Sequence, residues 1–321
     1  MATETISAKK FNLYHRTVEY GTIVILAVLM IVFTFLKPNE FLSFKNGLIL
    51  MQQVAPLGLS AIGLTFLMAM RHYDLSIGYT VSLSGVVVTT LFGLGFPEGW
   101  GIIATIIIIG GAVGLVNGLI VTFFRVPSLM VTIGVGFICY GVIYMITGGS
   151  AVYYGIPPHF AVYGRGIFLH LIPNSVIILA LLTAISVFIF HKTSFGRYVY
   201  AIGNNETASE LSGIRIKLVK IICFLLSSSF ACLAGMLIAS ENMVGHTTAG
   251  ERYLLHSLTA AFLGTSLFRK GEGNIWGTII GVLILGVAYN GMTMVGTPYT
   301  LREVITGTVL IVAMAISRLR E

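Results

Sequence analysis

The chain has 321 residues, of which 56% are hydrophobic and only 10% are charged. Soluble domains carry roughly 25% charged residues, so this composition excludes an ordinary water-soluble fold and points to a lipid bilayer as the solvent. The formal net charge of +7 does not indicate nucleic-acid binding, because the basic residues stand at the ends of apolar runs and no nucleic-acid motif is present.

The three cysteines, Cys139, Cys223 and Cys232, all lie inside apolar runs. Their odd number and spacing predict neither a disulfide framework nor a metal site. The N-terminus is polar to about Arg16 and then apolar for longer than a signal-peptide core, without a small-residue cleavage site. We therefore expect the first apolar segment to remain in the mature protein as a helix.

Apolar runs predict about ten transmembrane helices, because a helix needs about 20 mostly apolar residues to cross a bilayer. The eighth run is too short to cross alone, which predicts a broken or re-entrant helix. Pro56, with glycines nearby, predicts an interrupted second helix. The expected fold is an all-α membrane protein. In chain order, the predicted spans are 20–36, 47–70, 76–94, 101–124, 128–147, 174–191, 219–239, 257–268, 275–294 and 304–317.

The distribution of positive charge predicts the orientation of these spans. With the N-terminus in the cytoplasm and ten crossings, 14 of the 19 Lys and Arg residues fall inside and five outside. Cytoplasmic loops of membrane proteins carry such an excess, so both termini are expected to be cytoplasmic. An aromatic-rich segment, 150–173, is then expected outside.

The inner segment 192–220 holds five of the fourteen inside charges and predicts a short helix from Glu206 to Gly213 between two glycine-containing turns. Acidic residues in its first turns complement the helix dipole, and Gly213 stands where a left-handed cap is needed. The small side chains of Ala208 and Ser209 permit close approach of a partner. An ordinary capped loop helix explains the same pattern, so both interpretations stay open.

A few polar residues lie within or beside the apolar spans. They can line a path for a neutral hydroxylated solute, or they can hydrogen-bond neighbouring helices and, in the case of Asp74, cap the third helix. The candidate path residues are Gln52, Gln53, Asp74, Asn117 and Asn290.

Residues 201–214 match the A-x-G-x-N-x-x-A-x-x-x-S-G-I signature, and this segment resembles the permeases of ribose and simple-sugar ABC importers. Further stretches are similar to the same family, in order and at its spacing, from about Gly58 to the C-terminus. These stretches are 114–119, 126–134, 146–149, 248–255, 277–281 and 290–291.

The chain departs from the family pattern before the third helix. The family reads Thr-Gly-Gly-Ile-Asp-Leu-Ser-x-Gly, whereas this chain keeps the Asp-Leu-Ser-x-Gly part and replaces the two glycines by Arg71 and His72. We expect this change to affect the local backbone and the identity of the solute.

The resemblance implies one transmembrane permease domain over 1–321, with 1–18 as a cytoplasmic N-terminal segment and 192–218 as the loop that couples to an ATPase. The coupling residues implied by this resemblance are Asn204, Asn205, Glu206, Ala208, Ser209, Glu210, Ser212 and Gly213.

The resemblance also implies partners: two cytoplasmic ATP-binding subunits, an extracytoplasmic solute-binding protein, and a second permease chain, either identical or paralogous. The chain has no G-x-x-x-x-G-K-[ST] phosphate loop, so ATP and magnesium are expected on the ATPase, and no cofactor or metal on this chain. It also lacks the hydrolase and metalloprotease motifs, which argues against an intramembrane enzyme.

Two other classes of membrane protein stay open. An ion-coupled secondary transporter usually places acidic or histidine residues at mid-membrane, whereas nearly all Asp and Glu residues here fall in loops. A membrane receptor or scaffold is the third class. The glycine-rich broken helices are weak evidence against it. An importer permease in the bacterial inner membrane is the interpretation that the sequence favours.

Overall fold

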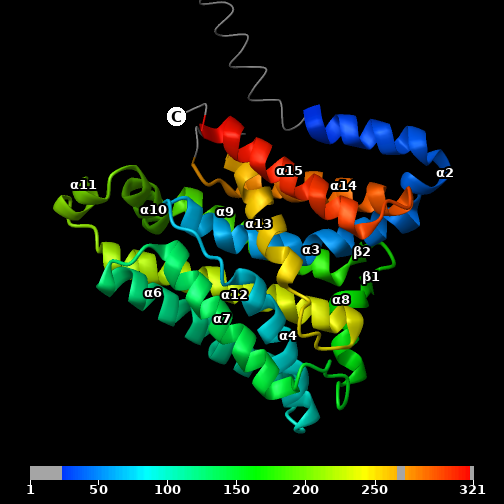
Figure 1. Cartoon of the computed structure of the whole chain (residues 1–321), viewed down its shortest axis with the longest axis horizontal. Helices are drawn as coiled ribbons and strands as arrows, with labels where there is room; N and C mark the ends of the chain where they lie inside the picture. The colour runs from blue at the N-terminus through cyan, green and yellow to red at the C-terminus, as the bar shows by residue number, and fades with distance from the viewer. Residues whose placement is uncertain (1–23, 266–271, 319–321) are drawn as a thin grey trace, which may run out of the picture.

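The computed structural model describes residues 24–265 and 272–318, and the side chains up to 311. Nearly every described element is a helix (Figure 1). After a helix at Val24–Leu36, the elements are α2 (Pro38–Phe41), α3 (Phe44–Met68), α4 (Ile77–Gly93), α5 (Glu98–Thr105), the π-helix η1 (Ile106–Gly111), α6 (Ala112–Phe124), α7 (Ser128–Thr147), the 3-10 helix η2 (Pro158–Phe160), α8 (Ala161–Arg165), β1 (Ile167–Phe168), β2 (Ile172–Pro173), α9 (Asn174–Lys192), α10 (Ser194–Asn204), α11 (Glu206–Leu211), α12 (Ile216–Asn242), α13 (Glu251–Thr265), α14 (Ile275–Met294) and α15 (Tyr299–Arg318).

Six helical stretches in the described part of the chain are long and apolar enough to cross a bilayer: α3, the continuous run from α5 to α6, α7, α9, α12 and α14. Val24–Leu36 and α4 are shorter apolar helices. Together with α13 and α15, they overlap all ten predicted spans. The 1–18 segment, the ends of two predicted spans (20–23 and 266–268) and the basic pair Arg269-Lys270 lie outside the described residues.

Helix α12 is the central element of the fold, with α3, α4 and α6 packed against it. Figure 1 shows α10 and α11 at one end of α12, and α8, β1 and β2 at the other. A glycine face on the π-helix and α6 lets α12 approach closely, because a Cβ on Gly114 would lie 2.6 Å from the Leu225 Cα and one on Gly118 would lie 3.0 Å from the Ile221 Cα. Such small-residue faces allow close backbone contact between membrane helices.

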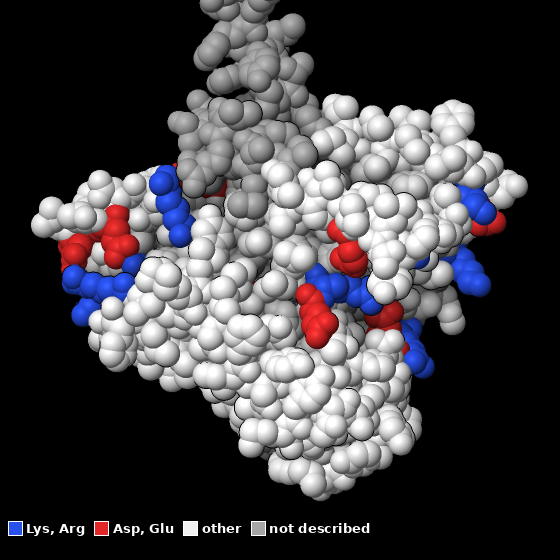
Figure 2. Space-filling model, viewed as in Figure 1, with Lys and Arg blue, Asp and Glu red and all other residues white. Residues whose placement is uncertain are grey.

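Large apolar side chains remain exposed along α7, including Met130, Phe137 and Met145. Figure 2 shows that the face formed by α4 and α7 is free of charge, while charged side chains gather near α10 and α11 and in the middle of the molecule. An uncharged apolar surface of this kind fits contact with lipid tails.

The predicted break in the second span is wrong. Helix α3 runs without interruption for 25 residues, and Pro56 lies inside it. A proline removes one backbone donor, but packed neighbours and nearby hydroxyls make this tolerable in membrane helices. From Val54 to its last residue, every residue of α3 is buried, so packing against its neighbours supports the helix through the proline.

The eighth span was predicted too late in the chain. Helix α13 begins at Glu251 rather than near residue 257, so its first turns include the charged residue Arg252. The short helix predicted from Glu206 to Gly213 corresponds to α11, which ends earlier, at Leu211.

The turn predicted at Gly203 does not exist, because this residue lies inside α10. A Cβ there would clash with the Ala69 carbonyl oxygen. Gly203 therefore serves close packing against the end of α3 and not a bend.

Candidate functional site

A cavity of about 460 Å³ lies between α3, α12, α13 and α14. Its volume falls in the range of roughly 300–1,000 Å³ usual for small-molecule sites. It lies at the end of α12 where Val152 and Gly245 pair through their backbones, and therefore opposite α10 and α11. Most of its lining side chains are polar, and those used below are Gln53, Glu241, Arg252, Tyr253, His256 and Tyr289.

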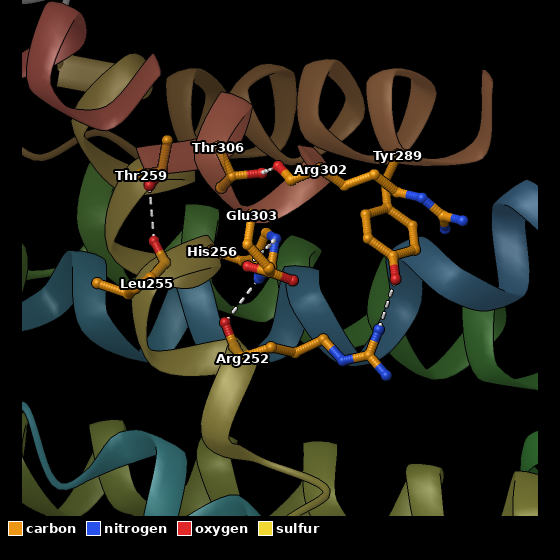
Figure 3. Close-up of polar contacts among 8 residues, drawn as sticks. All are labelled: Arg252, Leu255, His256, Thr259, Tyr289, Arg302, Glu303 and Thr306. Carbon is orange, nitrogen blue, oxygen red and sulfur yellow. Dashed lines mark hydrogen bonds and ion pairs between the residues drawn. The ribbon is translucent and has the colours of Figure 1, made fainter. Parts of the chain in front are cut away.

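The end of α12 directs the chain into this site. Met243 takes a left-handed conformation with φ of 55° and ends α12, and the irregular segment 243–250 then leads into α13. Arg252 and His256 are one helical turn apart and share a face of α13. Figure 3 shows both beside Tyr289 of α14, and Arg252 Nη1 donates to the Tyr289 hydroxyl at 2.8 Å.

The Tyr289 ring is held by two guanidinium groups. The central carbon of Arg252 lies 5.8 Å from the ring centroid and that of Arg302 lies 5.1 Å from it. Arg302 also donates to the Thr293 hydroxyl at 2.6 Å. Cations within about 6 Å of an aromatic centroid are attracted to the ring, so these contacts fix the tyrosine in the cavity wall.

Two buried polar atoms of cavity-lining residues have no hydrogen-bond partner. One is Gln53 Oε1 and the other is His256 Nε2. His256 Nδ1 lies 2.6 Å from the Arg252 carbonyl oxygen. The same ring's Nε2 is 4.0 Å from Glu303 of α15, too far for a hydrogen bond (Figure 3).

Asp74 and Asn117 meet in a closed network away from the cavity. Asp74 Oδ1 accepts from the Ser76 backbone at 2.9 Å and from the Ser76 hydroxyl at 2.5 Å, and Oδ2 accepts from the Ser227 hydroxyl at 3.0 Å. Asn117 donates to the same Ser76 hydroxyl at 3.0 Å. Asp74 is only 1% exposed, so the network ties the 69–76 segment to α6 and α12 and presents no open surface.

The other three predicted path residues are separated by the structure. Asn290 is buried and exchanges two hydrogen bonds of 3.0 Å with Asn46. Gln52 is half-buried and lies outside the cavity lining, whereas its neighbour Gln53 is part of it. Of the five candidates, Gln53 alone lines the cavity.

The predicted coupling residues cluster on α11 and its flanks. Asn205 caps α11 by accepting from the Ala208 backbone at 2.9 Å, and Gly213 has the expected left-handed φ of 80°. The side chains of Asn204, Ala208, Glu210 and Ser212 are exposed, whereas Ser209 is buried.

Glu206 is bound within the chain. Both of its carboxylate oxygens accept from the Lys220 ammonium at 2.8 Å, and this tethers α11 to the first turns of α12.

Sequence reasoning missed most of the cavity. Because the eighth span was expected to begin at 257, Arg252 counted as an outer-loop charge and His256 was not considered. The signal that could have found them is the i, i+4 spacing of Arg252 and His256 on the first turns of a short helix. Tyr289 was not singled out, although it directly precedes the Asn290-Gly291 pair. Glu241 was missed because the long apolar run before it was expected to end at 239.

Comparison with known proteins agrees with this architecture. Residues 47–314 match the family model described as "Branched-chain amino acid transport system / permease component". The chain is 30% identical over 323 residues to the Ribose import permease protein RbsC of Escherichia coli K12, covering 100% of both chains. It is 34% identical over 325 residues to RbsC of Bacillus subtilis, covering 99% of both.

More distant likenesses include the D-allose transport system permease protein AlsC of Escherichia coli K12, which is 28% identical over 320 residues, with 99% of this chain and 97% of AlsC covered. A solved metal-chelate type ABC transporter in an inward-facing conformation aligns with 87% of this chain and 88% of its own at a TM-score of 0.48 and 15% identity. On the family match and the full-length relatives, the chain belongs to this family of transport-system permease components and is a multi-pass protein of the bacterial inner membrane.

Proposed function

We propose that this chain forms the translocation path of a bacterial ABC importer for a sugar or a related small hydroxylated solute. The observation that carries the proposal is its similarity, over its whole length, to ribose import permeases. The cavity supports it, since hydrogen-bonding side chains, among them Tyr253 of α13 and Tyr289 of α14, suit a hydroxylated solute.

The transport cycle needs partners. Two permease chains, identical or paralogous, form the path, two cytoplasmic ATPase subunits bind ATP and magnesium, and an extracytoplasmic protein delivers the solute. This chain supplies no catalytic group, and its task is to alternate between two arrangements of its helices.

The cavity end of the molecule faces outward in this proposal. Lys217 lies over the Phe123 ring at 5.1 Å, which puts the basic residues around Arg125 and Arg215 at the same end as α10 and α11. Positive charge marks the cytoplasmic side. After replacement of the native cysteines, Ser150→Cys should react with an impermeant maleimide added outside, and Ser212→Cys should react only after the membrane is opened. Labelling of both from one side contradicts this orientation.

Helix α11 is the proposed contact with the ATPase. Its exposed Ala208 allows close approach, and Leu211, with 85% of its surface exposed, offers an apolar anchor. Ala208→Trp should overpack the contact, so that membrane insertion is normal while copurification with the ATPase and transport are lost. Ser150→Trp, an exposed site at the opposite end, is the control. Normal transport by Ala208→Trp excludes α11 as the coupling element.

Reconstitution separates the proposed function from its rivals. Proteoliposomes containing the chain, its ATPase and its binding protein should take up D-ribose, D-allose or D-xylose only with ATP. Uptake without the ATPase, driven by an ion gradient, identifies a secondary transporter. ATP-driven uptake of L-leucine with no sugar uptake assigns the chain to the amino-acid branch of its family, and no uptake of any solute favours a receptor or scaffold.

A further inference from the structure

The cavity contains polar groups that the fold itself leaves unused. We propose that it binds one monosaccharide directly, so that the permease recognises the solute in addition to its delivery protein. The choice of a sugar rests on the proposed function. The existence and position of the site rest on the geometry of Gln53, His256 and Tyr289.

The hydrogen-bonding roles of these three side chains can be read from their contacts. A carbonyl oxygen can only accept, so the His256 Nδ1 beside the Arg252 carbonyl carries the proton, and in the neutral ring Nε2 is then an acceptor. Gln53 Oε1 is a second acceptor without a donor. The Tyr289 oxygen accepts from Arg252, which leaves its own hydrogen free to donate.

A sugar hydroxyl fits this set because it both donates and accepts. Leaving a buried acceptor unpaired costs free energy that a donating ligand recovers. A carboxylate has no proton to donate to Gln53 or His256. A ligand with hydroxyls along its whole length can therefore satisfy groups that lie on different helices.

The arrangement of polar groups also argues against a branched-chain amino acid. Such a ligand needs charged partners at one end and an apolar pocket at the other. Here the polar side chains come from all four walls: Gln53 from α3, Glu241 from α12, Arg252 and His256 from α13, and Tyr289 from α14. Glu241 and Arg252 carry charge, but the polar groups are spread over four helices, which suits a ligand with hydroxyls along its whole length better than one with its charges at one end.

The wall is prepared for binding before a ligand arrives. Tyr289 lies between the guanidinium groups of Arg252 and Arg302, and Figure 3 shows α13, α14 and α15 meeting around it. A side chain held in place loses little conformational freedom when it binds, which favours affinity. Glu241, near the end of α12 opposite α11, brings the central helix into the same site.

The test uses the full-length permease in lipid nanodiscs, without partners, and saturation-transfer difference NMR with D-ribose, D-allose, D-xylose and L-leucine at millimolar concentration. At least one sugar should show saturation transfer, and leucine should not displace it. Gln53→Leu removes one acceptor at nearly constant volume and should weaken sugar binding about tenfold. Tyr289→Phe should weaken it severalfold.

The matched control is Gln52→Leu, the same substitution one residue earlier on α3 and outside the cavity lining, which should leave binding unchanged. Absence of signal for all three sugars, equal signals from the Gln52 and Gln53 variants, or displacement by leucine overturns the proposal. If Gln53→Leu shows normal ATP-driven sugar uptake, the cavity is not the sugar site, although the proposed function is unaffected. If the reconstituted importer takes up leucine and no sugar, the proposed function itself is wrong.

Discussion

Two irregular segments of this chain each connect a long helix to a shorter one. In one, the polar groups pair within the fold, whereas the other opens onto a cavity. Segment 69–76 connects long α3 to short α4, and segment 243–250 connects long α12 to short α13. Each contains a non-glycine residue in the left-handed region, Arg71 in the first and Met243 in the second. The Gly250 backbone of the second segment donates to the Ser82 hydroxyl of α4, the helix into which the first segment leads, at 2.8 Å.

The difference between them lies in their side chains. In the first segment the backbone of Leu75 donates to the Thr132 hydroxyl at 2.9 Å, and both oxygens of Asp74 are occupied. The second opens onto a cavity in which Gln53 and His256 lack partners. Irregular backbone at membrane depth is tolerated when it is buried in protein or lines a cavity, and these two segments illustrate the two cases. Asn117 Oδ1 beside the first segment also lacks a partner, so the candidate binding site is marked by two unsatisfied side chains, Gln53 and His256, that line one cavity.

The largest effect is expected at the closed segment. Asp74→Ala removes the acceptor for three hydrogen bonds, and unpaired buried donors cost about 1–3 kcal/mol each, so we expect roughly 3 kcal/mol or more of lost stability. The buried thiols of Cys139, Cys223 and Cys232 provide the measurement, because a thiol-reactive dye reports their exposure on heating.

Asp74→Asn is the control, since it keeps one carbonyl acceptor and should lose much less. If Asp74→Ala melts at the wild-type temperature but stops transport, the carboxylate belongs to the path, and the contrast between the two segments fails.

A second closed contact lies at the opposite end of α12 from the cavity. Lys220 is 9% exposed at its side chain and has Glu206 as its anion, at 2.8 Å. Glu206→Lys places a second cation beside it, and we expect about 2 kcal/mol of destabilisation with detachment of α11.

The exchanged pair Glu206→Lys with Lys220→Glu should recover most of the stability. If Glu206→Lys alone melts normally but releases the ATPase in a salt-dependent way, the carboxylate contacts the partner and not Lys220.

Apolar length is a strong signal, so a described helix overlaps each predicted span, although the eighth was placed too late, and local cap chemistry predicted the left-handed Gly213. The sequence did not distinguish Asp74 from Gln53. Both are polar residues beside apolar runs, and their roles depend on Ser227 and on His256, which are more than 150 residues away. The break expected at Pro56 failed for the same reason, because tertiary packing overrode a local preference.

The open site should respond more in binding than in stability. His256→Ala removes the free Nε2 acceptor, and the sugar concentration for half-maximal uptake should rise about tenfold, equivalent to about 1.4 kcal/mol. The melting temperature should fall modestly, because the change removes the Nδ1 hydrogen bond to Arg252 and the ring packing but no partner of Nε2. His256→Gln, which restores an acceptor, should recover part of the affinity. A large loss of stability with unchanged uptake would make His256 a structural residue like Asp74.

The smallest effect is expected at Arg71, where the family pattern has glycine. Arg71 has φ of 59°, a conformation that costs a residue with a Cβ roughly 1–2 kcal/mol. Arg71→Gly removes that strain, although the unfolded chain gains freedom, so the net gain should be below about 1 kcal/mol, a rise of a few degrees in the thiol-exposure assay. Arg71→Ala removes the same charge but keeps the Cβ and should give no gain. Equal stabilisation by both changes would mean that the guanidinium charge, rather than backbone strain, limits stability where the closed segment leaves α3.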